Sequence, residues 1–257
     1  MKKCMKEWRE NSLMKNRWPA AYKIIEELEQ AGFEAFVVGG AVRDFVRNAP
    51  ANDVDITTNA TPLEVKQIFT HTIDVGIEHG TVLVVVDEPI EVTTYRSEST
   101  YSDFRRPDGV TFVRNLQEDL QRRDFTINAM ALTKEDELVD YFGGKKAIEE
   151  EIIQAVGNPQ LRFSEDALRM LRAVRFSAQL NFTLEQETFQ AIRSLHALIE
   201  HVSIERVKVE LEKIWLSDFP FKGMKLFVES GLSQNFPGNW ERHLQSWDNF
   251  SSFNIKA

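Results

Sequence analysis

Two aspartates separated by one residue, Asp53 and Asp55, are the strongest candidates for chemistry in this sequence. They belong to the run DVDITT (53–58), whose Val, Ile and Thr content is typical of a β-strand. Residues two apart on a strand point to the same face, so we expect the two carboxylates to converge. Like charges this close resist joint ionisation unless a cation lies between them. Because Mg²⁺ binds through one or two carboxylates plus substrate phosphates, the pair predicts a magnesium site.

The segment before the aspartates has the features of a phosphate site. Gly39-Gly40 follows an expected strand, 33–38, and glycine lets the backbone approach a ligand closely. A helix is expected to begin near Val42, which directs its positive end towards the same place, and Arg43 adds a fixed positive charge. A D-x-D sequence also arises by chance, and Gly-Gly is often only a turn. Nucleotidyl transfer needs a phosphate-binding turn and a metal-binding pair of carboxylates together. We therefore favour the interpretation that these residues form a nucleotidyl-transfer site.

The elements that must position these residues differ between the two halves of the chain. Up to about Phe142 the pattern alternates short strands with short helices, and from about Lys145 it is helical, with no convincing strand. Strands are expected over 33–38, 53–58, 81–86 and 90–95, and helices over 21–28 and 61–69. In the second half, helices are expected over 164–178, 184–198 and 203–215, with a fourth ended by Gly231. The fold class is therefore α+β: a head with a small mixed sheet and helices, followed by an all-α region.

A block of charged residues, EDALRMLRAVRF (165–176), carries the chemistry of the second half. Four of its charged residues are spaced three apart and would spread over one broad face of a helix. They are Asp166, Arg169, Arg172 and Arg175. Arginines on one face repel each other unless anions lie opposite. Either Glu165 pairs with Arg169 as an i, i+4 ion pair, or the face binds an anionic ligand.

Composition narrows the class of protein. The chain has 257 residues and a net charge of −9, which argues against a large basic surface for nucleic acid but allows local clusters such as Arg122-Arg123. The single cysteine, Cys4, excludes an internal disulfide framework and a cysteine-based zinc site. The sequence shows neither an apolar run of transmembrane length nor a secretory signal. A cytoplasmic protein that does not bind a membrane is therefore expected.

Several further motifs occur in a fixed order along the chain. They are GGAVRDFVRNAPANDVDITT (39–58), VTTYR (92–96), RRPDGVTF (105–112), RRDFTINAMAL (122–132), Gly143-Gly144 and EDALRMLRAVRF (165–176). From about Phe33 to Gly231, this series resembles the class II tRNA nucleotidyltransferases, the CCA-adding enzymes. The related bacterial poly(A) polymerases share it, within the polymerase β-like nucleotidyltransferase superfamily. One departure is Tyr141, where the family usually has proline, and we expect a local backbone difference there.

The resemblance implies roles for individual residues. Asp53 and Asp55 would be catalytic and bind the metal, and Glu91 is either a third carboxylate of the site or a surface residue of its strand. Gly40, Arg43 and Arg123 would hold the nucleotide triphosphate. For Arg122, a role in the site and a role as a solvated surface charge explain the sequence equally well. The run 122–132 itself is interpreted as a buried helix, in which Asp124 and Asn128 organise the head; for Asp124, capping of the helix is the alternative.

Asp166 and Arg169 would select the base. Cytosine and adenine each present an amino donor beside a ring-nitrogen acceptor, which suits a carboxylate and a guanidinium. Guanine and uracil present the reversed order and would leave buried polar groups unpaired, at about 1–3 kcal/mol each. Amino-acid side chains would thus replace a nucleic-acid template. By resemblance, Arg172 and Arg175 also belong to the nucleotide site.

The implied activity is Mg²⁺-dependent, template-independent addition of CMP and AMP from CTP and ATP to the 3′ end of tRNA, with release of pyrophosphate. The stretch RRPDGV (105–110) resembles a loop that CC-only enzymes lack, so its presence favours addition of the full CCA sequence. The alternative is that it is a polar loop without a specific function. Alternatives within the class are a poly(A) polymerase and an A-only or CC-only enzyme. A D-x-D glycosyltransferase and a non-catalytic RNA-binding protein explain fewer of the motifs.

The same resemblance predicts a domain organisation. Residues 1–32 would form an N-terminal extension and helix, 33–144 the catalytic head, 145–232 a helical neck with the nucleotide-selecting helix, and 233–257 the start of a body region. Members of the family usually continue well past this length, so nucleotide binding is expected to survive while tRNA addition is weaker. The oligomeric state is not predicted by the sequence, although the family includes homodimers.

Overall fold

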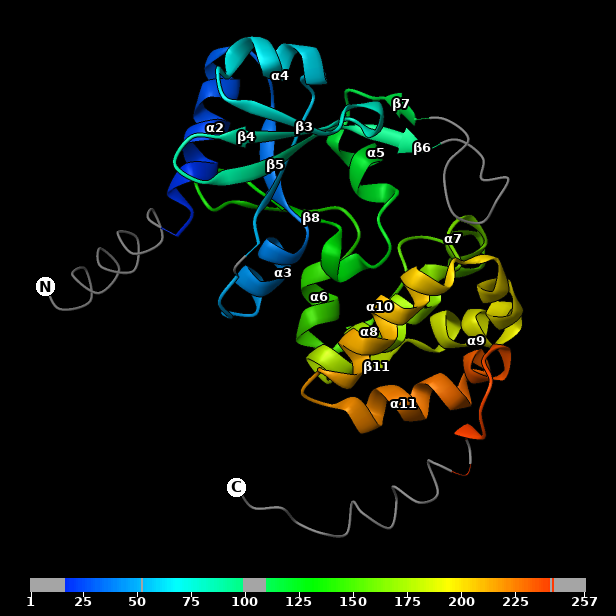
Figure 1. Cartoon of the computed structure of the whole chain (residues 1–257). Helices are drawn as coiled ribbons and strands as arrows, with labels where there is room; N and C mark the ends of the chain where they lie inside the picture. Colours follow the sequence, from blue (N-terminus) through cyan, green and yellow to red (C-terminus); the bar gives the residue numbers. More distant parts are fainter. Residues whose placement is uncertain (1–16, 52, 99–109, 241, 243–257) are drawn as a thin grey trace, which may run out of the picture. The chain divides into compact units, whose positions relative to one another are not determined.

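The structure of the chain, a computed structural model, describes residues 17–51, 53–98, 110–240 and 242. These residues fall into two compact units, coloured along the chain in Figure 1. The first comprises the described residues of 17–98 together with 110–148, and the second begins at Glu149. Cys4 and positions 105–109 of the expected loop lie outside the described residues. Within the described part of the chain, no helix is long and apolar enough to cross a membrane.

A seven-stranded mixed sheet forms the frame of the first unit, in the order β3-β4-β5-β2-β1-β8-β9. Its strands are β1 (Ala35–Val38), β2 (Asp55–Thr58), β3 (Thr72–Gly76), β4 (Thr81–Val85), β5 (Pro89–Thr94), β8 (Met130–Leu132) and β9 (Leu138–Asp140). Strands β2 and β5 run parallel, and all other neighbours are antiparallel. The expected mixed sheet is therefore confirmed, and the expected strands over 33–38, 81–86 and 90–95 correspond to β1, β4 and β5.

Short helices accompany this sheet. They are α2 (Pro19–Gln30), α3 (Gly40–Val46), α4 (Pro62–Ile68), α5 (Leu116–Gln121) and α6 (Gly144–Glu149), with 3₁₀ turns η1 (Ile77–His79) and η2 (Thr126–Asn128) and a hairpin of β6 (Arg96–Glu98) and β7 (Val110–Phe112). The predicted start of α4 is confirmed, because Thr61 and Glu64 form a capping box ahead of the first-turn proline. In α2, the apolar side chains at helical spacing are buried, as expected.

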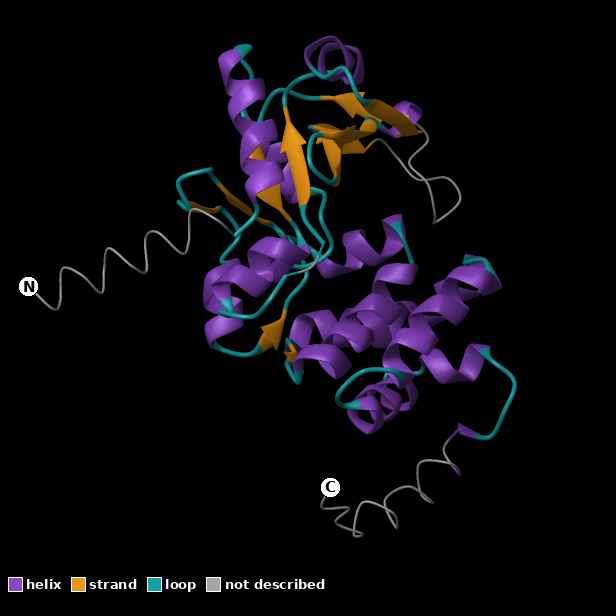
Figure 2. Ribbon diagram, turned by 60° about the vertical axis from the view of Figure 1, so that its left-hand side comes forward, coloured by secondary structure: helices purple, strands orange, loops and turns teal. Residues whose placement is uncertain are grey.

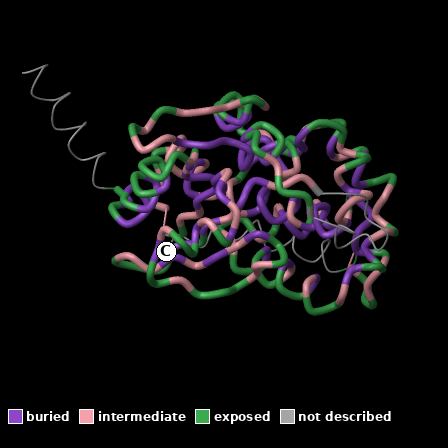
Figure 3. The backbone as a smooth tube through the Cα atoms, turned by 90° about the horizontal axis from the view of Figure 1, so that it is seen from above, coloured by how far each residue is buried: buried purple, intermediate pink, exposed green. Residues whose placement is uncertain are grey.

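Helix α5 is fixed to the sheet by its apolar residues. Leu116 and Leu120 are buried in one cluster with Val38 of β1, Tyr95 and Ala131 of β8. Figure 3 shows the buried stretches as purple segments that alternate with exposed ones along the chain. Because α5 packs through its leucines, its polar residues are held at a constant position relative to strands β1 and β8.

The second unit is mostly helical (Figure 2). It contains α7 (Pro159–Glu165), α8 (Leu168–Leu180), α9 (Gln186–Leu195), α10 (Ile204–Trp215), α11 (Pro220–Glu229) and the 3₁₀ turns η3 (His196–His201) and η4 (Leu232–Asn235). The expectation of no strand is wrong, since β10 (Ile152–Ile153) pairs in parallel with β11 (Thr183–Leu184). Two-residue strands are too short to produce a periodic signal in the sequence.

The helix expected from Ser164 to Ala178 is interrupted. Helix α7 ends at Glu165, and Asp166 has an extended conformation with φ −133° and ψ 104° before α8 begins. The carboxylate of Asp166 accepts a hydrogen bond of 3.0 Å from the backbone N–H of Leu168. Aspartate competes in this way with a continuous helix, so Asp166 does not share a helical face with the three arginines.

The run 122–132 is not the buried helix that its apolar residues predicted. It forms the 3₁₀ turn η2 and then strand β8, which pairs with β1. Every residue of β8 is buried, so neither a helical nor an alternating pattern distinguishes the two structures in the sequence. Pairing with a neighbouring strand decides the outcome.

Candidate nucleotide and metal site

Asp55 is the first residue of β2 and lies opposite Glu91 of β5 in the parallel register. Asp53 precedes the strand and is exposed, so the prediction that one strand presents both aspartates is wrong. The two carboxylates still interact. The pKa of Asp55 is raised to about 6, first by burial and then by the negative charges of Asp53 and Glu91, while the positive charge of Arg123 lowers it in part. Uncompensated negative charge is therefore concentrated at Asp55.

The donor set suits a hard divalent cation. Asp53, Asp55 and Glu91 offer only carboxylate oxygens, the ligands that Mg²⁺ prefers. Among the described residues, no group of three or more His, Cys, Asp or Glu side chains is arranged to hold a metal ion. One or two carboxylates are what Mg²⁺ commonly takes from a protein when substrate phosphates and water supply its other ligands. Glu91 is exposed, and its part in metal binding stays a prediction.

Gly39 is the point at which the glycine turn meets the charged residues. Its φ of +73° is a backbone conformation that glycine adopts without strain. A Cβ atom added there would lie 3.5 Å from Nη1 of Arg123 and 3.6 Å from Oδ2 of Asp55. The absence of a side chain at Gly39 therefore leaves room directly beside one positive and one negative group, where α3 begins at Gly40.

Arg43 of α3 is held in a polar network of the first unit. Its Nε and Nη2 atoms donate to the Asp44 carboxylate at 3.0 and 2.8 Å. Its Nη1 donates to the Asn128 side chain at 3.0 Å, and Asn128 in turn donates to Asp124 at 3.1 Å. Asp124 also accepts from the backbone N–H of Phe125 at 2.8 Å. Asp124 and Asn128 thus organise the first unit, as expected, and orient Arg43.

Asp119 of α5 organises the two arginines that follow it. Its Oδ1 accepts from Nε and Nη2 of Arg122 at 3.0 and 2.7 Å, and its Oδ2 accepts from Nη2 of Arg123 at 3.2 Å. The side chain of Asp119 is fully buried, whereas those of Arg122 and Arg123 are 16% and 17% exposed. Burial alone would raise the pKa of Asp119, but the charges of Arg122 and Arg123 hold it below its ordinary value.

The surroundings of Asp119 differ from the sequence predictions in two respects. Arg122 is not a solvated surface charge, because it forms a salt bridge with a buried carboxylate. Asp119 itself was not among the predicted site residues. The signal that could have identified it is its spacing, since Asp119 lies three and four residues before two consecutive arginines, as i, i+3 and i, i+4 ion pairs require.

In the second unit, Asp166 and Arg169 each have other partners. Oδ2 of Asp166 accepts from Nη2 of Arg206 at 3.0 Å. Nη1 of Arg169 donates to Oε2 of Glu165 at 2.7 Å, so the i, i+4 pair considered from the sequence is confirmed. Both side chains are largely buried, with 17% of Asp166 and 10% of Arg169 exposed. Arg206 was not predicted and holds one carboxylate oxygen of Asp166.

The remaining two arginines of α8 have different surroundings. Arg175 is buried and forms an ion pair of 2.5 Å with Glu210 of α10, and it also donates to Gln179 at 2.8 Å. Arg172 is partly exposed, and its guanidinium lies 5.5 Å from the ring centre of Phe176. The structure therefore ties Arg175 to neighbouring side chains of the second unit, whereas Arg172 remains partly accessible to solvent.

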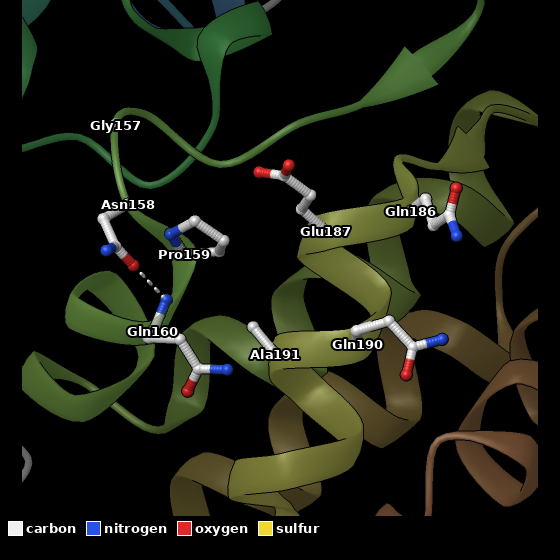
Figure 4. A pocket seen from close by; sticks show the side chains of 8 residues that line it. All are labelled: Gly157, Asn158, Pro159, Gln160, Gln186, Glu187, Gln190 and Ala191. Carbon is white, nitrogen blue, oxygen red and sulfur yellow. Dashed lines mark hydrogen bonds between the residues drawn. The ribbon is translucent and has the colours of Figure 1, made fainter.

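A pocket of about 720 Å³ in the second unit lies where α7 and α9 begin (Figure 4). Its walls carry amide side chains and one carboxylate: Asn158, Gln160, Gln186, Gln190 and Glu187. Asn158 also caps α7, accepting from the backbone N–H of Gln160 at 2.9 Å. None of the residues predicted to bind nucleotide lines this pocket, so we assign it no part in nucleotide chemistry.

Comparison with known families matches most of the chain. Residues 35–154 match the model of the "Poly A polymerase head domain". Residues 181–241 match the model described as "Probable RNA and SrmB- binding site of polymerase A". The first match contains the sheet and the residues around Asp55, and the second begins after α8.

Individual relatives and a solved structure agree with these matches. The CCA-adding enzyme of Lactobacillus johnsonii is 52% identical over 220 residues, which cover 85% of this chain and 55% of the relative. That of Bacillus cereus is 50% identical over 244 residues, covering 92% and 62%. The crystal structure of the Bacillus stearothermophilus CCA-adding enzyme in complex with CTP superposes with a TM-score of 0.81 at 46% identity, covering 87% of this chain and 54% of that one. The chain thus spans a little over half the length of the relatives it matches.

Proposed function

Because the chain belongs to the family of CCA-adding enzymes and poly(A) polymerases, we propose that it is a tRNA nucleotidyltransferase that adds CMP and AMP to the 3′ end. The family consists of nucleotidyltransferases that need a divalent metal. The observation that carries the proposal is the position of Gly39, beside both Asp55 and Arg123. Such an arrangement lets one triphosphate contact a carboxylate-bound cation and a guanidinium at the same time.

The proposed reaction is attack by the terminal ribose hydroxyl of tRNA on the α-phosphorus of CTP or ATP. A new P–O bond forms, the bond between the α- and β-phosphates breaks, pyrophosphate leaves and the hydroxyl loses its proton. Asp53 and Asp55 would hold Mg²⁺, which lowers the pKa of the attacking hydroxyl and neutralises charge on the leaving group. Glu91 would add negative charge beside Asp55 from the neighbouring strand. Positioning and electrostatics suffice, without a covalent intermediate.

The triphosphate would be held by Gly40, Arg43 and Arg123. Support comes from the fixed geometry of the two arginines: Arg43 is oriented by Asp44 and Asn128, and Arg123 by Asp119. A guanidinium that is already oriented loses less conformational entropy when it binds phosphate. Arg123 keeps Nη1 beside Gly39, which makes it the stronger candidate for direct contact.

Base selection is proposed for Asp166 and Arg169, with Arg172 contributing positive charge. The largely buried position of both side chains supports this, because polar groups discriminate strongly only where water cannot replace a missing partner. Arg175 is engaged by Glu210, so we propose that it serves the nucleotide site by connecting α8 to α10.

The remaining parts of the proposal concern organisation and partners. We propose a catalytic head over 33–144, a helical neck over 145–232 and the start of a body region over 233–257. The substrates would be CTP, ATP and the tRNA 3′ end, in the cytoplasm. The relatives support this, since solved structures of CCA-adding enzymes include complexes with CTP and with ATP.

The experiment is incubation of the 257-residue chain with Mg²⁺, labelled CTP or ATP, and tRNA that ends before CCA, after C or after CC. We expect two CMP and one AMP on the shortest substrate, and no addition by Asp55→Ala. Addition of AMP only to tRNA ending in CC would show an A-only enzyme. Addition of CMP alone would show a CC-only enzyme, and untemplated A tails would show a poly(A) polymerase. A folded chain that adds nothing, or Asp55→Ala with unchanged activity, would overturn the proposal.

A further inference from the structure

Among the described residues of the first unit, Asp119 is the most deeply buried charged residue. Its side chain has no solvent exposure, and its pKa is held low by two arginines. Aspartate is rarely fully buried unless it is paired. Asp119 accepts hydrogen bonds from four different residues of the first unit: Arg122, Arg123, Thr57 and Arg96.

Those four residues come from three places in the first unit: Thr57 lies on β2, Arg96 begins β6, and Arg122 and Arg123 follow α5. Thr57 of β2 donates its hydroxyl to Oδ2 of Asp119 at 3.3 Å, and Thr57 is two residues from Asp55 on the same strand. The backbone N–H of Arg96, at the start of β6, donates to Oδ1 at 3.4 Å. Arg123 donates to Oδ2 at 3.2 Å. One carboxylate thus joins the strand of Asp55 to the guanidinium of Arg123.

The geometry of Arg123 depends on this carboxylate. Asp119 binds Nη2, whereas Nη1 lies beside Gly39 and Asp55. The Nε atom is buried and has no hydrogen-bond partner among the described residues. Because a guanidinium is planar and rigid, fixing Nη2 also fixes the direction of Nη1. We propose that Asp119 is a positioning residue for nucleotide transfer, which orients Arg123 towards the triphosphate and keeps it in register with Asp55; this rests on the proposed function.

The test compares Asp119→Asn, Arg123→Ala and the double variant in the full 257-residue chain, with the KM for CTP and kcat measured on tRNA lacking CCA. Asparagine keeps the size of the side chain but removes the charge that binds both arginines. We expect Asp119→Asn to raise the KM for CTP at least tenfold with a smaller change in kcat. The double variant should be no worse than Arg123→Ala, because Asp119 acts through Arg123.

Two further variants separate positioning from folding. Asp119→Asn combined with Arg122→Gln removes one buried positive charge together with the negative one, so the protein should fold and still show the raised KM. The matched control is Asp136→Asn, in the same unit, which weakens the 2.5 Å contact with the Tyr22 hydroxyl. This control is expected to lower thermal stability while leaving the KM for CTP within twofold of wild type.

The outcomes distinguish the two proposals. An inactive wild-type chain would overturn the proposed function, and equilibrium binding of labelled CTP with Mg²⁺ would then test the orientation of Arg123 by the same set of variants. An active wild type with unchanged KM in Asp119→Asn or in its charge-balanced form would overturn the positioning role alone. Additive effects of Asp119→Asn and Arg123→Ala would do the same, as they would show that Asp119 acts independently of Arg123.

Discussion

At the scale of single residues, the first unit contains two aspartates in opposite electrostatic states. Asp119 is buried between two arginines, which keep its pKa low. Asp55 is partly buried near two other carboxylates, and burial first and then their charges raise its pKa to about 6. A group whose ionisation is stabilised supports the fold, whereas one whose ionisation is opposed is suited to receive a cation. The two aspartates therefore contribute separately to stability and to the proposed chemistry.

Replacing Asp55 by asparagine should stabilise the metal-free protein above pH 6. The folded-state pKa of about 6 exceeds the ordinary value of 3.8, so the wild type loses stability as pH rises from the lower value to the higher. Two pKa units correspond to about 3 kcal/mol, and partial solvent exposure reduces the expected gain to about 1–2 kcal/mol. Chemical denaturation at pH 8, with EDTA present, measures this difference in the free energy of unfolding between the variant and wild type.

The same comparison at pH 3.5 provides the control, because Asp55 is then mostly protonated in both folded and unfolded chains. The difference between variant and wild type should nearly vanish there. If the variant is less stable than wild type at pH 8, or is stabilised equally at both pH values, the ionisation of Asp55 is not the cause of the effect.

Part of the candidate site follows from residue types alone. The glycine pair and Asp55 belong to one motif and Arg123 to another, and the structure brings Gly39, Asp55 and Arg123 together. Arg206 could not be identified in this way, and for Asp119 the spacing to Arg122 and Arg123 indicates ion pairs but not burial. Their importance depends on which helix packs against which strand or neighbouring helix.

At the scale of elements, the strongest local signals predicted the fold best. Helix α4 has a cap, a first-turn proline and a capping-box glutamate within its first residues. Strand β8 and the break at Asp166 were missed for a different reason. In each case the preference of the segment is weak, and a tertiary or capping hydrogen bond decides: pairing with β1 for β8, and the bond to Leu168 for Asp166.

Two adjacent glycines at the start of α6 should differ in their tolerance of alanine. Gly143 has φ +75° with no atom within 4 Å of an added Cβ, so alanine there costs only backbone strain of about 1 kcal/mol. At Gly144 the Cβ would lie 2.3 Å from the backbone oxygen of Thr126 and 2.7 Å from Met130. Because backbone atoms cannot move aside, Gly144→Ala should cost about 3 kcal/mol. Urea denaturation of both variants checks the order, and equal losses would refute it.

The ion pair between α8 and α10 should contribute strongly to the stability of the second unit. Arg175 and Glu210 are both buried, with 9% and 5% of their side chains exposed. Glu210→Ala leaves a buried guanidinium without its carboxylate and should cost about 3–5 kcal/mol. The double variant Arg175→Met and Glu210→Met should recover most of this loss, because it leaves no unpaired charge. Denaturant midpoints decide the question: if the double variant is as unstable as Glu210→Ala, the loss comes from packing and not from charge.

At the scale of the whole molecule, the net charge of −9 opposes the approach of a polyanion such as tRNA. Under the proposed function, tRNA binding would therefore depend on local positive charge, for which the described residues offer Arg122 with Arg123, one of whose charges Asp119 balances, and the partly exposed Arg172. Repulsion acts at long range and attraction at short range, so salt should affect the two differently.

The dependence of kcat/KM for tRNA on salt should therefore pass through a maximum. At about 0.01 M salt the Debye length is about 30 Å, and the whole negative chain repels the substrate. Near 0.1 M it falls to about 10 Å, which screens this repulsion while leaving direct contacts between arginine and phosphate largely intact. Higher salt then weakens those contacts as counterions compete. Initial rates between 10 and 300 mM KCl, at constant free Mg²⁺ and saturating CTP, measure the profile. A steep fall from the lowest concentration onward would show instead that a positive surface governs the encounter, in spite of the sign of the net charge.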